Sequence, residues 1–332
     1  MCYPYDSMDP LYQMLDECAS DDRVSEIRIS LHKFGSNSSI IEKVIELSNK
    51  GKSVVVLMNE EVHYDYLLNK DWTCELILNG VKVVYAECPF KLHTSMLQIA
   101  INETGESNYI TCFTTGDFVN GNSEKYTDFA LVTSDIEIGN SAAELWNDIL
   151  NGEISTYSKL LTSPNDLKRM LMHLIRLESE RGQEGRIFIK VNELSDPDIV
   201  EELKNASING CNIRLLVSGA CCLLPGVDGF TENIDVVNIV SRYSEHSRVY
   251  LFGNEEHEAM LISSADLTKS SLEDSIEYAC PVLNPELKKR IKAILYLNYV
   301  DNVKGKQLCS DGIYRRRFIS DKKLNSQELL MG

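Results

Sequence analysis

Two histidines stand in matched sequence settings, and together they could carry out phosphoryl transfer. His93 opens an apolar run and precedes Asp117 by 24 residues. His246 opens a second apolar run and precedes Asp266 by 20 residues. A pair of facing imidazoles suits phosphoryl transfer, because one can act as the nucleophile while the other donates a proton or stabilises charge. Either histidine alone would more often make an ordinary structural hydrogen bond, so the matched setting is what favours catalysis.

The elements that must position these histidines follow an α/β pattern. Three segments have apolar residues at helical spacing, then a glycine that ends the helix, then a β-branched run. These segments are 39–58, 71–86 and 196–219. Such alternation of helices and strands predicts α/β layers with mainly parallel strands.

The larger pattern occurs twice along the chain. Each half contains a strand, a helix, a second strand, a histidine-bearing strand, and a stop of small residues followed by aspartate. In the first half these segments are 26–31, 39–50, 53–58, 91–101 and 114–118. In the second half they are 186–191, 196–208, 212–217, 244–252 and 263–267. We therefore expect a duplicated α/β unit with its boundary near 153–163, in which packing about a pseudo-twofold axis would bring the two imidazoles to one site.

Composition and charge narrow the classes of function. The 332 residues are 43% hydrophobic and 25% charged, as expected for a globular protein of two domains. With 33 basic and 50 acidic side chains, the net charge is −17. This negative charge argues against binding of nucleic acid, which needs a basic surface. It also argues against binding of any other polyanion, unless basic side chains are concentrated in one channel.

The sequence also argues against a membrane span and a cysteine-based metal site. No stretch reaches the roughly 18–20 consecutive apolar residues of a membrane helix, and residues 1–10 do not resemble a signal peptide. We therefore expect a cytoplasmic protein. The 10 cysteines include no CxxC pair and no Cys/His cluster with metal-binding spacing, so we expect reduced thiols and no metal ligands among them.

Several longer motifs resemble bacterial polyphosphate kinases of type 1 in their order and spacing. They are YPYDSMDP (3–10), YTDFALVTSD (126–135), LLVSGACCLLPGVDGFTENI (215–234), SRYSEHSRVYLF (241–252), SSADL (263–267) and DNVKGKQL with DGIY (301–314). The resemblance extends to about Arg317 and matches the C-terminal catalytic half of that family. It implies two phospholipase D-like α/β domains with mostly parallel or mixed sheets. The first would span 1–155 and the second 156–317, followed by a polar tail at 318–332 that we expect to be mobile.

The resemblance also implies a reaction and roles for three residues. The reaction is reversible transfer of the γ-phosphate of ATP to polyphosphate through a phosphohistidine, with Mg²⁺ as cofactor. By position, His93 matches the phosphorylated histidine and His246 its partner. Tyr126 matches the residue that stacks on the adenine ring. The expected partners are therefore ATP or ADP and polyphosphate, with neither nucleic acid nor a membrane, and an oligomer is compatible with the family.

Many of the family's phosphate-gripping cations are replaced in this chain. The family's lysine two residues after the phosphorylated histidine is Ser95, and an asparagine of the following stop is Asp117. Arginine positions of the family are occupied by Lys33, His63, Glu124, Ser218, Ser270 and Ser275. One arginine can contribute roughly 10³–10⁵ in rate to phosphoryl transfer, so the loss of several would leave little catalysis.

The cations that remain could still line a phosphate site. We expect nucleotide or phosphate contacts from Lys33, His63, Lys190, Arg242 and Arg248, with Lys91 close to them. The alternative for each is a solvated surface charge, which is the commoner fate of a lone lysine or arginine.

Three functions are consistent with these residues. The first is a polyphosphate kinase-like enzyme weakened by its missing cations. The second is a non-catalytic paralogue that binds a nucleotide or another partner, and the depleted cations favour it. The third is a phosphohydrolase in which water attacks the phosphohistidine. Retention of His93, His246, Tyr126 and Asp128 favours the first or the third.

Overall fold

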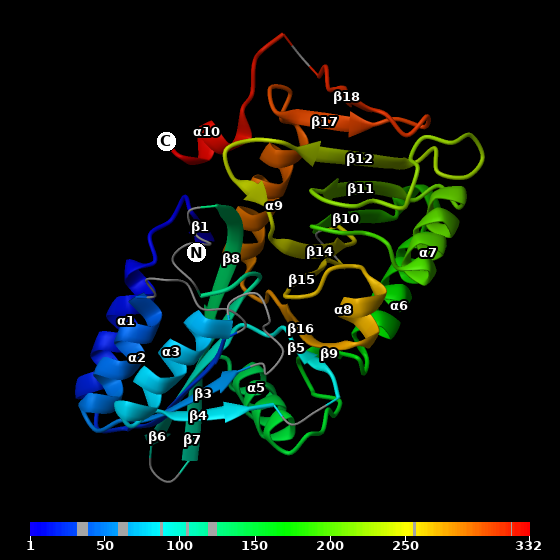
Figure 1. Cartoon of the computed structure of the whole chain (residues 1–332). Helices are drawn as coiled ribbons and strands as arrows, with labels where there is room; N and C mark the ends of the chain where they lie inside the picture. Colours follow the sequence, from blue (N-terminus) through cyan, green and yellow to red (C-terminus); the bar gives the residue numbers. More distant parts are fainter. Residues whose placement is uncertain are drawn as a thin grey trace.

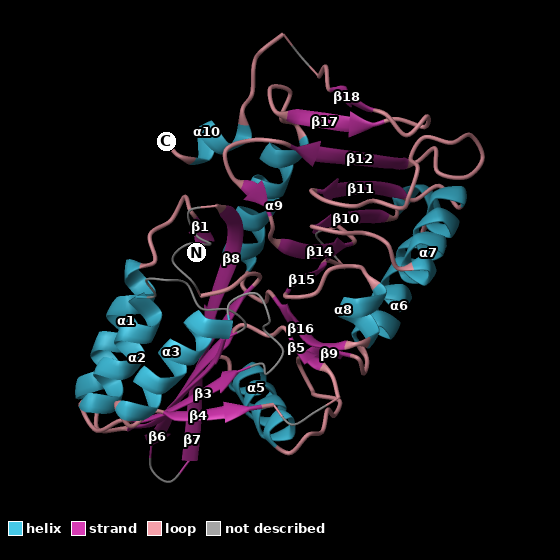
Figure 2. Ribbon diagram, in the orientation of Figure 1, coloured by secondary structure: helices cyan, strands magenta, loops and turns pink. Residues whose placement is uncertain are grey.

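The computed structural model describes residues 1–31, 39–58, 66–86, 89–103, 106–118, 125–254, 257–319 and 321–332. It contains two α/β units, one formed by the first half of the chain and one by the second (Figure 1). Each unit is a layer of strands with helices on both faces (Figure 2). No helix of the described ranges combines the length and apolar character needed to cross a bilayer.

The first unit is built on a mixed sheet with the strand order β1-β8-β7-β6-β2-β3-β4. Its strands are β1 (Cys2–Tyr3), β2 (Val24–Leu31), β3 (Ser53–Met58), β4 (Lys82–Tyr85), β6 (Met96–Glu103), β7 (Glu106–Thr114) and β8 (Tyr126–Thr133). Its helices are α1 (Asp9–Ser20), α2 (Ser39–Asn49), α3 (Tyr66–Leu78) and α5 (Ile136–Leu150). Leu15 of α1 packs with Ile41 of α2 and Ile27 of β2 on one face. Trp146 of α5 packs with Phe113 of β7 on the other face.

The second unit is built on a longer sheet with the order β18-β17-β12-β11-β10-β14-β15-β16-β5, and β9 pairs with β16. Its strands are β9 (Leu161–Ser163), β10 (Arg186–Val191), β11 (Asn212–Val217), β12 (Ile234–Ile239), β14 (Arg248–Phe252), β15 (Ala259–Ser263), β16 (Ser275–Pro281), β17 (Gly305–Leu308) and β18 (Tyr314–Arg316). Its helices are α6 (Leu167–Glu180), the 3₁₀ turn η2 (Gly182–Glu184), α7 (Pro197–Ile208), α8 (Lys269–Glu273), α9 (Pro285–Tyr299) and α10 (Ser326–Leu330). Leu171 of α6 and Leu203 of α7 are buried against one face of this sheet. Leu295 of α9 is buried on the opposite face.

The duplication expected from the sequence is visible in the strand order. The path β4-β3-β2-β6-β7-β8 corresponds to β12-β11-β10-β14-β15-β16. In both paths the first three strands are parallel and the next ones antiparallel. The sheets are therefore mixed rather than mainly parallel. Helices α2, α3 and α7 cross between neighbouring parallel strands, whereas the segment 218–233 between the parallel strands β11 and β12 contains no helix.

The two units share one apolar core. Trp146 and Leu145 of α5 belong to the same buried cluster as Ile294 and Leu295 of α9. The cluster includes buried residues from both sheets. The two α/β units are thus fixed against each other by apolar packing, which removes this surface from water.

Two short strands cross from one unit to the other. Strand β5 (Lys91–Leu92), just before His93, pairs in parallel with β16 of the second unit. Strand β13 (Ser244–Glu245), just before His246, pairs in parallel with β8 of the first unit. The crossings are equivalent, because β16 and β8 occupy the same place in the two strand orders. Each histidine therefore sits where its own half of the chain reaches the sheet of the other half.

The C-terminal segment is partly docked onto the second unit. Helix α10 begins at Ser326, and the side chains of Asn325, Ser326 and Gln327 are buried. The predicted polar tail at 318–332 therefore includes buried polar side chains. Polar composition is a poor guide here, because polar side chains can be buried where they find hydrogen-bond partners.

Candidate active site

His93 is held by a carboxylate from the second unit. Leu92 lies opposite Ile276 in the β5–β16 ladder, and the backbone N–H of His93 donates to the Ile276 carbonyl at 3.1 Å. This register places His93 beside Glu277, with 3.2 Å between Nδ1 and Oε1. Glu277 is buried; burial raises the pKa of its carboxyl group, and the hydrogen bond with His93 offsets part of that rise.

His246 is held by a carboxylate from the first unit. Glu245 lies opposite Thr127 in the β13–β8 ladder. The next residue, His246, therefore meets Asp128, with its Nδ1 at 3.1 Å from Oδ1 and 3.0 Å from Oδ2. The hydroxyl of Thr115 also donates to Asp128 Oδ1 at 2.8 Å. In both pairs the imidazole nitrogen in use is Nδ1, which leaves Nε2 as the other ring nitrogen.

Asp128 fits only because a glycine stands behind it. A Cβ atom added to Gly116 would lie 2.2 Å from Asp128 Oδ2, well inside van der Waals contact. The corresponding residue in the second stop is Ala265. The glycine is thus a steric requirement of the His246–Asp128 pair.

Arg248 links the two stops of the duplicated pattern. Its Nη1 donates to the carbonyl of Thr115 and its Nη2 to Asp266 Oδ2, both at 2.7 Å. Asp266 Oδ1 also accepts the backbone N–H groups of Asn192 at 2.7 Å and Glu193 at 3.0 Å. Burial works to raise the pKa of Asp266, but the Arg248 charge and these hydrogen bonds outweigh burial and lower it. The pair is therefore charged, and most of the positive charge of Arg248 is compensated.

Ser95 occupies the position in the first half that Arg248 occupies in the second. Each lies two residues after its histidine. The Ser95 hydroxyl donates to Asp117 Oδ1 at 3.2 Å, in the manner in which Arg248 contacts Asp266. The first half thus has an aspartate equivalent to Asp266 but lacks the guanidinium.

The two histidines line a single polar cavity of about 210 Å³. The lining residues are His93, Ser95, Thr115, Gly116, Asp117, His246, Arg248, Ser264, Asp266, Ser271 and Glu277. Among these described residues Arg248 is the sole lysine or arginine, against three carboxylates. The cavity therefore offers two imidazoles for chemistry but little positive charge for a phosphate.

The other predicted contact residues lie in different places. The ring of Tyr126 lies 5.0 Å from that of His246 at an interplanar angle of 50°, so it borders the site. Lys190 is buried and donates to Glu245 rather than lining the cavity. Arg242 is exposed, and its guanidinium lies 5.1 Å from the ring centre of Tyr243.

Three further positions complete the predicted set. Lys91 lies in β5 and is exposed. Lys33 and His63 lie outside the described residues, so their predicted contacts stay predictions.

Glu277 is a site residue that the sequence reasoning missed. A signal for it exists in the duplication, since Asp128 follows Asp117 by 11 residues and Glu277 follows Asp266 by the same 11. A carboxylate within the otherwise uncharged run SIEYACP is a second signal. Aligning the two halves beyond their stops would have identified it.

The described residues do not form a metal centre of their own. No group of three or more His, Cys, Asp or Glu side chains in the described ranges converges as ligands would. The carboxylates of the cavity are instead engaged by Ser95, Arg248 and His93. Within the described ranges, this donor set does not fit a resident Mg²⁺ ion.

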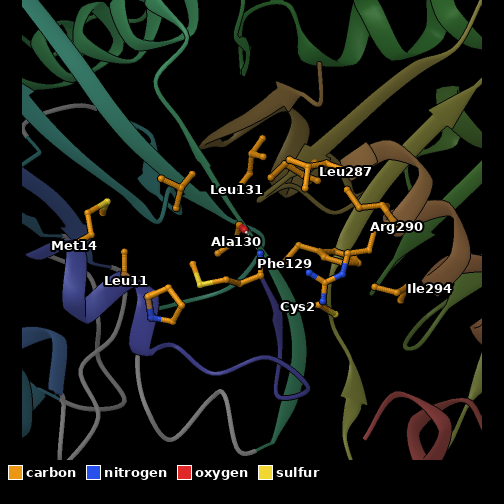
Figure 3. A pocket seen from close by; sticks show the side chains of 14 residues that line it. Cys2, Leu11, Met14, Phe129, Ala130, Leu131, Leu287, Arg290 and Ile294 are labelled. Carbon is orange, nitrogen blue, oxygen red and sulfur yellow. Dashed lines mark hydrogen bonds between the residues drawn. The ribbon is translucent and has the colours of Figure 1, made fainter. Parts of the chain in front are cut away.

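A second, larger cavity has a different character. It measures about 330 Å³ and is lined mainly by apolar residues of α1, β8 and α9. Figure 3 shows Leu11 and Met14 on one side and Leu287 and Ile294 on the other. Its charged residue, Arg290, pairs with Asp6. No histidine lines this groove, and burial raises the pKa of its Cys2 thiol to about 12, so the candidate active site is the polar cavity.

Comparisons with known proteins match the two parts of the chain to two separate domains. Residues 1–156 match the family model described as polyphosphate kinase C-terminal domain 1, and residues 160–327 match polyphosphate kinase C-terminal domain 2. A polyphosphate kinase of Pseudomonas aeruginosa is 34% identical over 320 residues, which are 95% of this chain and 46% of that protein. One from Helicobacter pylori is 33% identical over 328 residues, or 98% and 48% of the two chains. The chain thus spans about half the length of the curated relatives it matches.

Solved structures lead to the same family and the same fold. The crystal structure of polyphosphate kinase from Porphyromonas gingivalis is similar with a TM-score of 0.90 and 31% identity, covering 100% of this chain and 51% of that one. Phosphatidylserine synthase from Haemophilus influenzae has a TM-score of 0.62 and 14% identity, covering 90% of this chain and 85% of that one. The second match concerns the fold alone. The resemblance stated from the motifs and the predicted fold class are both confirmed.

Proposed function

The chain belongs to the polyphosphate kinase family, and from this premise we propose that it transfers phosphoryl groups through a phosphohistidine on His93. The observation that supports the proposal most strongly is the pairing of the two histidines in one polar cavity. Each is oriented through Nδ1 by a carboxylate of the other half of the chain. A histidine fixed in this way presents Nε2 in a defined tautomer, which is what a nucleophile requires.

In the proposed first step His93 takes the γ-phosphoryl group of ATP. Nε2 attacks the γ-phosphorus, an N–P bond forms, the bond to the bridging oxygen breaks, and ADP leaves. The ring becomes cationic in the phosphohistidine, and the Glu277 carboxylate beside Nδ1 stabilises that charge. The more exposed position of His93, at 35% against 24% for His246, suits the residue that must reach the substrate.

In the second step an oxygen at the end of a polyphosphate chain attacks the same phosphorus and the N–P bond breaks. His246, held by Asp128, is placed to donate a proton or a hydrogen bond to the oxygens that carry developing charge. We propose that Tyr126 stacks on the adenine ring and that Mg²⁺ accompanies the phosphates of the nucleotide. The same steps run in reverse would form ATP from polyphosphate and ADP.

The rate of this reaction should be low. Of the lysines and arginines that the structure describes, Arg248 is the one that lines the cavity, and its charge is already compensated by Asp266. In the first half Ser95 and Asp117 stand where a cation would assist the transferred group. Each missing arginine can lower the rate of phosphoryl transfer by roughly 10³–10⁵, so this site should be a weak catalyst.

The contact between Ser95 and Asp117 also favours a second candidate function. A cavity with three carboxylates and one compensated guanidinium could serve a regulatory paralogue that binds nucleotide without turning it over. A third candidate, attack of water on the phosphohistidine, requires the same first step as the kinase. It differs in the product, which would be inorganic phosphate rather than a longer chain.

Incubation with γ-labelled ATP and Mg²⁺ tests the proposal. We expect acid-labile label on the wild-type protein and none on His93→Ala. His173→Ala is the matched control, because His173 is exposed on α6, and it should label like the wild type. Ser95→Lys should restore a missing cation and raise the labelling rate at least about tenfold. Chasing the labelled protein with polyphosphate or with buffer alone then distinguishes transfer from hydrolysis.

Two results would contradict the proposal. Equal labelling of His93→Ala and the wild type would move the nucleophile elsewhere. If neither the wild type nor Ser95→Lys takes up label, while ATP still shifts the thermal unfolding midpoint, the non-catalytic nucleotide binder would be the better description.

A further inference from the structure

The short strand before His246 is anchored by a side chain from the last helix of the chain. Strand β13 has only two residues, and its strand partner is β8. A ladder of this length contributes few hydrogen bonds, so it needs other support to stay in register. Figure 1 shows the C-terminal helix α10 at the end of the molecule where β1 and β8 lie.

The support comes from the carboxamide of Gln327 in α10. Its Oε1 accepts the backbone N–H of Tyr243 at 3.0 Å, and its Nε2 donates to the Tyr243 carbonyl at 2.8 Å. The same Nε2 donates to Oε1 of Glu245 at 2.7 Å. The side chain is 1% exposed, so these bonds are made away from water. Gln327 therefore holds the backbone and the side chain of the segment that leads into His246.

Glu245 depends on this contact because its carboxylate is buried. Its Oε2 accepts from Lys190 and from the hydroxyl of Thr127, the latter at 2.8 Å. Its other oxygen, Oε1, accepts from Gln327 Nε2. A buried charge is tolerated only when it is paired and hydrogen-bonded, so loss of one donor weakens the whole arrangement. Thr127 in turn precedes Asp128, the partner of His246.

Helix α10, which carries Gln327, is anchored by hydrogen bonds to the rest of the second unit. The backbone N–H and the hydroxyl of Ser326 both donate to Asp301 Oδ2, at 2.7 and 2.8 Å. Asn302 accepts the Leu324 N–H at 2.9 Å and donates to the Lys322 carbonyl at 2.9 Å. The helix is thus tied to the residues that follow α9, and Gln327 is positioned by a rigid element.

We propose that Gln327 is a positioning residue for His246. By fixing Tyr243 and Glu245, it keeps β13 in register on β8 and so keeps Asp128 against the imidazole. The catalytic consequence rests on the proposed function, in which His246 assists transfer from the phosphohistidine. His93 should not depend on Gln327, because the equivalent crossing places the apolar Leu92 against Ile276.

The test compares the reactivity of the two histidines with diethyl pyrocarbonate, followed by peptide mass spectrometry. In Gln327→Ala we expect carbethoxylation of His246 to become at least about fivefold faster, while that of His93 changes less than twofold. Glu328→Gln is the matched control, because Glu328 is an exposed neighbour on the same helix, and it should change neither rate. This readout needs no turnover, so it is independent of whether the protein labels with ATP.

Activity gives a second readout for the catalytic consequence. If the phosphohistidine reaction operates, Gln327→Ala should lower kcat at least tenfold with KM for ATP within about twofold. Absence of ATP labelling in the wild type, together with selective exposure of His246 in the variant, would remove the proposed function and leave the positioning role intact.

Two outcomes would overturn the inference. One is an unchanged His246 rate in folded Gln327→Ala, and the other is an equal increase for both histidines, which would indicate general loosening. Should the alanine variant fail to fold, amide hydrogen exchange of the wild type decides the matter. Slow exchange of the Tyr243 amide supports the Gln327 contact, and exchange as fast as in an exposed loop refutes it.

Discussion

The two crossings between the halves have the same backbone geometry but different side chains. At the first, Leu92 lies opposite Ile276, and both are fully buried in the shared apolar core. At the second, Glu245 lies opposite Thr127 and needs Lys190 and Gln327 to satisfy its carboxylate. Each crossing places a histidine beside a carboxylate of the other half. The same kind of strand crossing is thus stabilised by apolar burial in one case and by a polar network in the other. The polar crossing depends on hydrogen bonds from Lys190 and Gln327.

A second difference concerns the residue two positions after each histidine. In the second half Arg248 binds Asp266, whereas in the first half Ser95 binds Asp117. The two halves therefore place equivalent residue positions around the site, but the side chains at these positions differ in charge. The positions of the histidines and the cations around them are therefore independent features of the site. Both histidines are kept, whereas the first half lacks the cation that the second half has.

Among the substitutions that test the difference between the two halves, Gly116→Ala should have the largest effect on stability and activity. Its new Cβ would overlap Asp128 Oδ2, so the carboxylate must move away from His246. We expect the free energy of unfolding to fall by about 1–3 kcal/mol, the usual cost of overpacking, and phosphoryl transfer to fall with it. Urea unfolding and the γ-labelled ATP assay measure the two effects.

The control for this change lies at the equivalent position of the other half. Ala265→Gly removes a methyl group without creating a clash, and it should cost only roughly 1 kcal/mol, mainly through greater freedom of the unfolded chain. If Gly116→Ala is as stable as the wild type, Asp128 is not confined as described.

A smaller effect is expected in the pH dependence of stability. Burial raises the pKa of Glu277 above its ordinary value of 4.5, so between 4.5 and the raised value the folded state binds more protons than the unfolded state. This contribution to stability is fully present below pH 4.5 and is lost as the pH rises through the folded pKa. Glu277→Gln cannot titrate, so its stability relative to the wild type should increase with pH over that window.

Urea unfolding at a series of pH values from 4 upwards measures this trend. The exposed Glu286→Gln serves as the control, and it should run parallel to the wild type. A relative stability of Glu277→Gln that falls with rising pH would mean that the folded state favours the charged form of Glu277, contrary to the burial argument.

Much of the fold and part of the site could be predicted from the sequence. The duplicated strand and helix pattern, the stops ending in Asp117 and Asp266, and the two histidines all follow from local residue patterns. The crossings could not be predicted, because two-residue strands such as β5 and β13 have no periodicity and their partners are distant in the chain.

Two other contacts have a related cause. The composition of residues 318–332 predicts a solvated segment, whereas the burial of Gln327 depends on contacts with Tyr243 and Glu245. Lys190 stays a predicted phosphate contact, and in the structure its ammonium group donates to Glu245. In each case the decisive partner comes from a different part of the chain, which a local pattern does not reveal.

Nitrogen-15 NMR of histidine side chains tests the central claim, that each imidazole is held by the carboxylate of the other half. Substitution of His93 and His246 in turn assigns their ring resonances. The structure predicts that Asp128→Asn shifts the Nδ1 and Nε2 signals of His246 and leaves those of His93 unchanged, and that Glu277→Gln does the reverse. If each carboxamide instead perturbs the histidine of its own half, or neither histidine, the exchanged pairing is wrong.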